Sequence, residues 1–144
     1  MDTSMSTPDN RTDKRKLGDL GESVACSFLE NKGFRVMDRN YLKKWGEIDI
    51  VVEKGGLWRF IEVKSIKNKQ GNVTREKEKY VPQETYRPED NIHPQKLRRL
   101  ARTIETYILE KKIDAEWQID AITVRLDMEN RRAKIDWIEN IVGI

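Results

Sequence analysis

The feature that most constrains the fold is a pair of apolar, β-branched runs on either side of two glycines. Residues 46–53 read GEIDIVVE, residues 57–65 read LWRFIEVKS, and Lys54, Gly55 and Gly56 separate them. Runs rich in Ile, Val, Phe and Trp that flank a Gly-Gly pair are typical of a β-hairpin with a two-residue turn. We therefore expect two antiparallel strands that turn at Gly55 and Gly56.

The length of this turn sets which charged side chains meet. With a two-residue loop, Asp49 falls directly opposite Glu62, and Glu47 falls directly opposite Lys64. Because side chains alternate along a strand, all four then lie on one face of the hairpin. A longer or bulged turn would shift the pairing between the strands, but it would leave the alternation within each strand unchanged.

The other elements follow from the same periodicities. A loop that is dense in Lys, Glu, Asn, Gln and Pro is expected at residues 66–90, and its length favours a mobile segment. Pro94 is a favourable first residue for the helix after this loop. The expected elements outside the hairpin are helices at residues 18–32 and 94–111 and strands at residues 34–41, 118–126 and 133–138.

The order of these elements predicts the fold class. Helix, three strands, helix and two strands (α-β-β-β-α-β-β) indicate an α/β protein with one central, mixed, five-stranded sheet flanked by helices. A chain of 144 residues has the length of one ordinary domain. We expect a flexible N-terminal tail over residues 1–16 and a single domain over residues 17–144.

Composition excludes several classes of protein. The single cysteine, Cys26, cannot form an internal disulfide, and no Cys/His cluster has the spacing of a zinc site. The polar N-terminus is unlike a signal peptide, and no apolar stretch approaches the ~20 residues that span a bilayer. We expect a soluble, cytoplasmic protein with no membrane partner.

The facing carboxylates point to a bound cation. Like charges directly across a sheet repel, and a divalent cation between Asp49 and Glu62 would remove the repulsion. Oxygen ligands without Cys or His suit Mg²⁺ or Mn²⁺ better than zinc. The neighbouring Lys64 adds a positive group that can orient a phosphate or stabilise negative charge. Attack of a metal-activated water on a phosphodiester uses all of these groups.

Plain structural interpretations remain beside this one. Glu47 and Lys64 can form an ordinary cross-strand ion pair, and for Glu47 that interpretation is the stronger one. Asp49 can lie on a solvated sheet face, as charged strand residues usually do. The Asp49–Glu62 pair is harder to explain in this way, because no neutralising partner is left for it in the hairpin.

These motifs resemble those of a known group of nucleases. The run from Gly46 to Asp49, followed by Glu62-Val63-Lys64, is similar to the D…(D/E)-x-K pattern of the restriction-endonuclease-like superfamily. Over residues 18–140 the chain resembles more specifically the YraN family of bacterial proteins. The residues that carry this likeness are Gly21, Glu22, Ala25, Gly33, Asn40, the two hairpin motifs, Lys96, Ala101, Asp120-Ala121-Ile122 and Ile138-Glu139-Asn140.

The resemblance implies a restriction-endonuclease-like fold and a set of site residues. Asp49, Glu62 and Val63 would be the metal ligands, and Lys64 would be the catalytic lysine. Glu22 matches the glutamate that the first helix contributes in Holliday-junction resolvases. From its position alone, Glu22 is equally well explained as a helix-start residue that the helix dipole favours.

The second helix suggests a contact surface for nucleic acid. Residues 92–112 carry more basic than acidic side chains, and Arg99 and Arg102 share one side of the helix with Gln95. Lys96 is the residue that we expect to contact a phosphate backbone. A solvated helix face explains the same charges equally well.

We expect a Mg²⁺- or Mn²⁺-dependent endonuclease that acts on DNA, in particular branched or structured DNA. One alternative is a nucleic-acid-binding protein that keeps the nuclease fold without turnover, and another is an enzyme for RNA or single-stranded ends. A one-domain nuclease needs a second active site to cut both strands, so a homodimer is also expected. His93 is expected to be a helix-entry residue and Cys26 a packed residue. Asp120 could support the site from a neighbouring strand, but the sequence does not place that strand closely enough to assign it.

Overall fold

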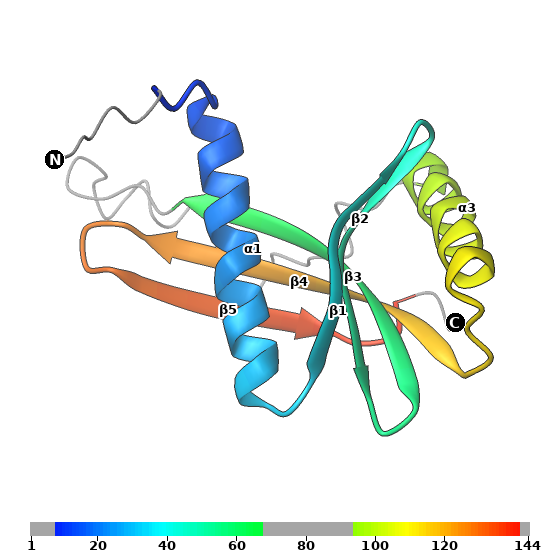
Figure 1. The fold of residues 1–144 in the computed structure, drawn as a ribbon. Coiled ribbons are helices and arrows are strands. Elements are labelled where there is room, and N and C mark those ends of the chain that lie inside the picture. The colour runs from blue at the N-terminus through cyan, green and yellow to red at the C-terminus, as the bar shows by residue number, and fades with distance from the viewer. Residues whose placement is uncertain (1–7, 68–93, 142–144) are drawn as a thin grey trace, which may run out of the picture.

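Five strands form one mixed sheet with a helix on each face (Figure 1). The computed structural model describes residues 8–67 and 94–141. The elements are α1 (Asp13–Asn31), β1 (Arg35–Lys43), β2 (Gly46–Lys54), β3 (Leu57–Lys67), α3 (Pro94–Lys111), β4 (Trp117–Asp127) and β5 (Arg132–Ile138). The expected single α/β domain of order α-β-β-β-α-β-β is therefore confirmed, and it is consistent with a nuclease-like fold.

The strands follow one another across the sheet in the order β1-β2-β3-β4-β5. Three of the neighbouring pairs are antiparallel, and β3 and β4 are parallel. Parallel neighbours need a crossover connection, and the chain between β3 and β4 contains α3. Because of this crossover, α3 begins beside the strands that carry the acidic residues of the hairpin.

The Gly55–Gly56 turn has the predicted form. Lys54 pairs with Leu57, and both glycines have positive φ, at 61° and 87°. Positive φ at both central residues defines the type I′ turn of a two-residue hairpin and explains why glycine occupies both positions. The predicted register is confirmed from this turn as far as the pair Ile50–Ile61.

Beyond that pair the two strands separate, so the predicted facing pairs Asp49–Glu62 and Glu47–Lys64 do not belong to the ladder. Figure 1 shows β1 and β2 bending towards α3 while β3 continues beside β4. The bend brings Gly46 close to α3, where an added Cβ would lie 2.5 Å from the Thr103 hydroxyl oxygen and 3.1 Å from the Arg99 carbonyl oxygen. This contact lies far away in the sequence, and the hairpin alone does not predict it.

Two element boundaries also differ from the expected ones. Helix α1 begins at Asp13 instead of residue 18, so residues 13–16 are helical and do not belong to a tail. The Thr12 side chain caps this helix by accepting a hydrogen bond from the Arg15 amide at 3.1 Å. The first turns carry charged residues and no apolar stripe, and hydrophobic periodicity therefore missed them.

Strand β3 continues to Lys67, so Ile66 and Lys67 belong to the sheet and not to the expected loop. The rest of that loop and His93 lie outside the described residues.

Each helix packs over its own apolar cluster. Helix α1 places Ala25, Cys26 and Leu29 against Ile50 and Ile61, among others. Helix α3 packs on the other face through Leu100, Ile104 and Tyr107, against Ile48, Val51, Phe60 and Ile119. Strand β2 is buried on both faces as a result. Cys26 is packed, as expected, and burial raises the pKa of its thiol.

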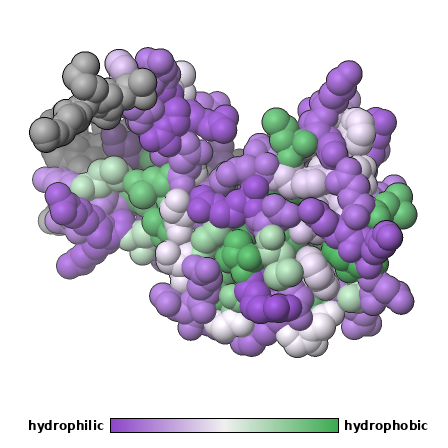
Figure 2. All heavy atoms as spheres, in the orientation of Figure 1, coloured by the Kyte–Doolittle hydropathy of each residue, from purple (hydrophilic) through white to green (hydrophobic). Residues whose placement is uncertain are grey.

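Hydrophilic residues dominate the visible surface, which is hollowed between the start of α1 and the β1–β2 hairpin (Figure 2). Neither helix of the described ranges combines the length and apolar character needed to cross a bilayer.

Candidate functional site

The point where β2 and β3 separate holds the acidic pair of the hairpin. Asp49 lies on the β2 side with 9% of its surface exposed, and Glu62 lies on the β3 side. The Val63 amide donates a hydrogen bond to Asp49 Oδ2 at 2.8 Å. The Asp49 side chain thus binds a β3 amide at the point where pairing between the two strands has ended.

The surroundings of Asp49 disfavour its negative charge. Burial raises the pKa of Asp49 to about 8, the nearby Glu62 charge adds to the rise, and the Val63 amide opposes it. Within the described residues, this buried carboxyl has one hydrogen-bond donor and a second acidic group beside it, and it forms no ion pair with a basic side chain. A cation in this position would lower the pKa and favour the charged form.

Glu62 has a partner that the hairpin did not predict. Its Oε2 forms an ion pair with Nζ of Lys96, in the first turn of α3. The Glu62 side chain is 13% exposed, while that of Lys96 is 48% exposed. The predicted DNA-contacting lysine therefore neutralises one of the predicted metal ligands, and this ion pair is open to solvent on the lysine side.

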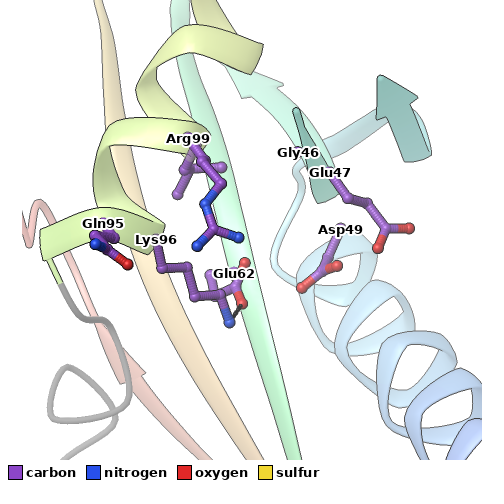
Figure 3. A pocket seen from close by; sticks show the side chains of 8 residues that line it. Gly46, Glu47, Asp49, Glu62, Gln95, Lys96 and Arg99 are labelled. Carbon is purple, nitrogen blue, oxygen red and sulfur yellow. Dashed lines mark ion pairs between the residues drawn. The ribbon is translucent and has the colours of Figure 1, made fainter. Parts of the chain in front are cut away.

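The acidic pair opens onto two adjoining cavities. One, of about 490 Å³, lies towards α3, and its lining is Gly46, Glu47, Asp49, Glu62, Gln95, Lys96, Arg99 and Leu100. Figure 3 shows Gln95, Lys96 and Arg99 on one side of it and Glu47 and Asp49 on the other, with Glu62 between them. The second, of about 260 Å³, lies towards α1 and shares Asp49, Glu62 and Lys96 with the first.

Lys64 and Glu47 both lie at the site but not together. Lys64 is exposed and lines the cavity towards α1, beside Asp49 and Glu62. Glu47 is exposed and lines the cavity towards α3. No ion pair joins these two residues in the described ranges, so the simpler interpretation of Glu47 as the ion-pair partner of Lys64 is wrong.

Glu22 reaches the site from α1, as the resemblance implied. It lines the cavity that also contains Asp49, Glu62 and Lys64. Its Oε1 atom is buried without a hydrogen-bond partner among the described residues, although an Arg39 nitrogen lies 3.9 Å away. Burial raises the pKa of Glu22, and the Glu47 charge adds to the rise. An added Cβ at Gly21 would lie 1.7 Å from the Ser65 hydroxyl oxygen, so Gly21 allows α1 to approach β3 closely at this point.

The predicted contact residues of α3 divide into two groups. Gln95, Lys96 and Arg99 line the cavity above the acidic pair. Arg102 lies further along the helix, with its guanidinium carbon 4.2 Å from the centre of the Trp45 ring. That contact holds Arg102 beside the β1–β2 turn, next to the cavity and outside its lining.

The residues at the site fit a hard divalent cation in their chemistry. The cavity lining offers the carboxylates of Glu22, Asp49 and Glu62, and Val63 lines the same cavity beside three lysines. No three Asp, Glu, His or Cys side chains of the described ranges are already grouped as a metal site. The site offers a carboxylate pair, and Mg²⁺ commonly binds through one or two carboxylates while water and substrate phosphate supply its other ligands.

Asp120 has a structural place, which the sequence left unassigned. It is fully buried on β4 and accepts hydrogen bonds from Arg59, Gln118, Trp137 and the Asn140 amide at 2.8–3.0 Å. It lines neither cavity of the acidic pair. Asp120 therefore ties β3, β5 and the chain after β5 to the middle of the sheet.

Sequence reasoning missed one residue at the site, Lys14. It lines the cavity towards α1 together with Lys64, yet it was assigned to a flexible tail. The available signal was Thr12 followed by Asp13, because a Thr N-cap and an acidic first residue are typical of a helix start.

Together, the fold and the site define an α/β domain with an acidic pair at a fork in its mixed sheet and with basic residues from α3 above it. The profile of the Uncharacterised protein family UPF0102 matches residues 21–124. The chain belongs to this family, and the expected relationship to YraN proteins is thereby confirmed.

Curated relatives cover nearly the whole chain. A UPF0102 protein of Campylobacter jejuni subsp. jejuni (strain 81-176) is 35% identical over 124 residues, which cover 86% of this chain and 91% of the relative. One from Sulfurovum sp. (strain NBC37-1) is 36% identical over 125 residues with the same coverage of both chains. One from Wolinella succinogenes is 32% identical and covers 88% of this chain and 96% of its own length.

Proposed function

We propose that the chain is a divalent-metal-dependent nuclease that hydrolyses phosphodiester bonds in DNA. The observation that carries this proposal is the Asp49–Glu62 pair. Asp49 is buried beside a second carboxylate and has one hydrogen-bond donor among the described residues, and the pair lies open to a cavity with basic residues on its α3 side. Such a pair is costly as plain structure and is well suited to holding a cation.

Asp49, Glu62 and the main-chain carbonyl of Val63 would hold Mg²⁺ or Mn²⁺. When bound, the cation would polarise a phosphoryl oxygen of the substrate and make a water molecule more acidic. Glu47 lines the same cavity as Asp49 and Glu62 and would add a further carboxylate to the site. The oxygen-only ligand set favours these two ions over zinc.

The chain's own residues prepare the site for this reaction. The Val63 amide holds Asp49 in one orientation and favours its charged form. Asp49 must lose its proton before it can act as a ligand, and its raised pKa makes that step dependent on pH near neutrality. The buried Oε1 of Glu22 is free to accept a hydrogen bond from a water molecule in the cavity.

Two lysines would contact the phosphate of the substrate. The Lys64 ammonium lies at the cavity beside the acidic pair, where it can stabilise negative charge that develops on the phosphate. Lys96 would leave Glu62 when a cation takes its place and would then be free to bind a backbone phosphate. Gln95, Arg99 and Arg102 extend that contact along α3.

A second candidate is a nucleic-acid-binding protein without turnover. The Lys96–Glu62 ion pair favours it, because Glu62 already has a cationic partner that is part of the chain. Binding of Mg²⁺ or Mn²⁺ separates the two candidates. An enzyme requires the cation at millimolar concentration or below, whereas a binding protein does not.

The direct test is cleavage of labelled duplex, single-stranded, flap and four-way-junction DNA, and of matched RNA, with Mg²⁺ or Mn²⁺. We expect the wild type to cut at least one DNA structure, and Asp49→Ala and Lys64→Ala to reduce cutting by about 10²–10³-fold or more. Glu129→Ala, in the exposed β4–β5 turn, is the matched control and should cut like the wild type. Equal cutting by all variants would indicate a contaminating nuclease and would remove the support for this site.

The same preparations test the expected homodimer. Cutting both strands of a junction calls for two sites, so sedimentation of the protein with an uncut junction should show two copies on each DNA. A single copy on each junction would restrict the proposal to cleavage of one strand.

A further inference from the structure

The two cavities of the acidic pair continue into a third one, which lies towards the start of α1. This cavity has a volume of about 580 Å³, and its lining is Asn10, Arg11, Thr12, Lys14, Arg15, Gly18, Asp19, Glu22, Asn40 and Glu47. It shares Lys14, Gly18 and Glu22 with the middle cavity, and it shares Glu47 with the cavity beside α3. The three cavities therefore form one groove, which we call the α1–α3 groove.

Charged residues of both signs line this groove along its whole length. The middle cavity contains Glu22, Asp49 and Glu62 together with Lys14, Lys64 and Lys96. The α3 end adds Glu47 and Arg99, and the α1 end adds Arg11, Arg15 and Asp19. The carboxylates repel a phosphate backbone, so affinity has to come from basic residues that are not already paired with them.

The basic residues at the α1 end differ in how far they are neutralised. Arg11 forms ion pairs with Asp9 and Asp19, and Arg15 lies 3.5 Å from Asp19. Lys14 takes part in no ion pair within the described ranges. It is also the basic residue that lines both the middle cavity and the α1 cavity.

Lys14 stands where helix stability alone would not favour a cation. It is the second residue of α1, and the positive end of the helix dipole lies in this first turn. Lys14 is exposed and has no ion-pair partner within the described ranges, so its charge is available to a ligand in the groove. A phosphate group is the partner that fits both the charge and the groove.

We propose that the α1 end of the groove is a second backbone-binding site, in which Lys14 holds a phosphate on the side of the acidic pair opposite Lys96 and Arg99. This proposal rests on the proposed nuclease function and defines the path of its substrate. The family profile matches residues 21–124, so the first turns of α1 lie outside it, and the site follows from this chain's own residues.

The test compares Lys14→Ala with Lys16→Ala. Lys16 is exposed on the same helix, two residues away, and lines none of the three cavities, so the control removes the same charge from the same region. Binding to labelled single-stranded and junction DNA is measured by fluorescence anisotropy over a range of salt concentrations. EDTA is present, so that cleavage does not contribute.

Loss of one phosphate contact should reduce the slope of log K against log salt by about 0.7–0.9 for Lys14→Ala. Lys16→Ala should change the slope by less than half as much, and Lys14→Arg should restore the wild-type slope. Equal changes for Lys14→Ala and Lys16→Ala would overturn the second site, while DNA binding by the wild type would leave the proposed function standing. Failure of the wild type to bind any of the DNAs would overturn both.

Discussion

Two aspartates of the same sheet, Asp49 on β2 and Asp120 on β4, are both withdrawn from solvent, and their surroundings are opposite. Asp120 accepts hydrogen bonds from four donors, and one of these is the Arg59 guanidinium. Within residues 8–67 and 94–141, Asp49 accepts one hydrogen bond, from the Val63 amide, and has the acidic Glu62 beside it. The fold thus supplies positive charge and donors to one buried carboxylate and leaves the other short of both.

The comparison separates a structural group from a functional one. A buried carboxylate with four donors connects strands and needs nothing from outside the chain. A buried carboxylate with a raised pKa, a second carboxylate and an open cavity is suited to receive a cation. Each of the following predictions tests this division.

The largest effect is expected at the structural group. Asp120→Ala leaves Trp137 and the Asn140 amide without an acceptor and removes one of the two acidic partners of Arg59. We expect the free energy of unfolding, measured with urea, to fall by about 3–5 kcal/mol. A fall below about 1 kcal/mol would mean that this network does not hold the strands together.

Asp49 should differ from Asp120, because its contribution to the free energy of unfolding should change with pH in a known direction. Its pKa of about 8 in the folded chain lies above its ordinary value of 3.8, so the folded chain retains a proton that the unfolded chain releases. The stability from this group is complete below the lower pKa and is lost as the pH rises through the higher one.

Asp49→Asn removes this dependence. Between about pH 4 and 8 the wild type should lose stability relative to Asp49→Asn, by at most about 1.4 kcal/mol per pH unit in metal-free buffer. Urea unfolding of both proteins at several pH values measures the difference. Parallel pH profiles for the two proteins would contradict the raised pKa.

The acidic site also depends on close approach of α1, and two glycines of this helix test that dependence. Gly21→Ala would place a methyl group 1.7 Å from the Ser65 hydroxyl oxygen, whereas an added Cβ at Gly18 meets no atom within 4 Å. We expect Gly21→Ala to lower the free energy of unfolding by about 1–3 kcal/mol. Gly18→Ala should raise it by up to about 1 kcal/mol through helix propensity. The same sign for both substitutions would show that α1 packs less closely than the structure has it.

The smallest effect concerns the Lys96–Glu62 ion pair, which competes with a cation. Lys96→Met should raise the affinity for Mn²⁺ about two- to fivefold, as expected for loss of a half-exposed ion pair. Arg98→Met, an exposed residue of the same helix that lines neither cavity of the acidic pair, removes the same charge and should change the affinity less. Calorimetric titration of both variants measures the difference, and equal affinities would exclude Lys96 as a competitor.

Local chemistry explains which parts of the fold could be predicted. The Gly55–Gly56 pair determines a two-residue turn, and the turn determines the register as far as Ile50–Ile61. Apolar periodicity placed α3 and the last two strands to within a residue or two. These features depend on neighbouring residues, which the sequence displays directly.

The predictions that failed involve contacts between distant segments or a helix start that carries no apolar pattern. The expected facing of Asp49 and Glu62 failed because pairing between β2 and β3 ends at Ile50–Ile61. Beyond this point Gly46 lies against α3, a contact between distant segments that the hairpin sequence does not display. The pairing of Lys96 with Glu62 depends on the same arrangement of α3. The start of α1 was missed because its charged first turns carry no apolar periodicity. For the same reason Lys14 was not predicted to be a residue of the site.

The most direct test of the division between the two aspartates is calorimetric titration of Mn²⁺ into the wild type and Asp49→Asn, with Glu129→Gln as an exposed control. We predict that the wild type and Glu129→Gln bind Mn²⁺ at millimolar concentration or below. Binding should release protons below about pH 8, because Asp49 must deprotonate. Asp49→Asn should bind at least about tenfold more weakly, with less proton release. No binding by the wild type, or equal binding by Asp49→Asn, would contradict a cation site at Asp49 and Glu62.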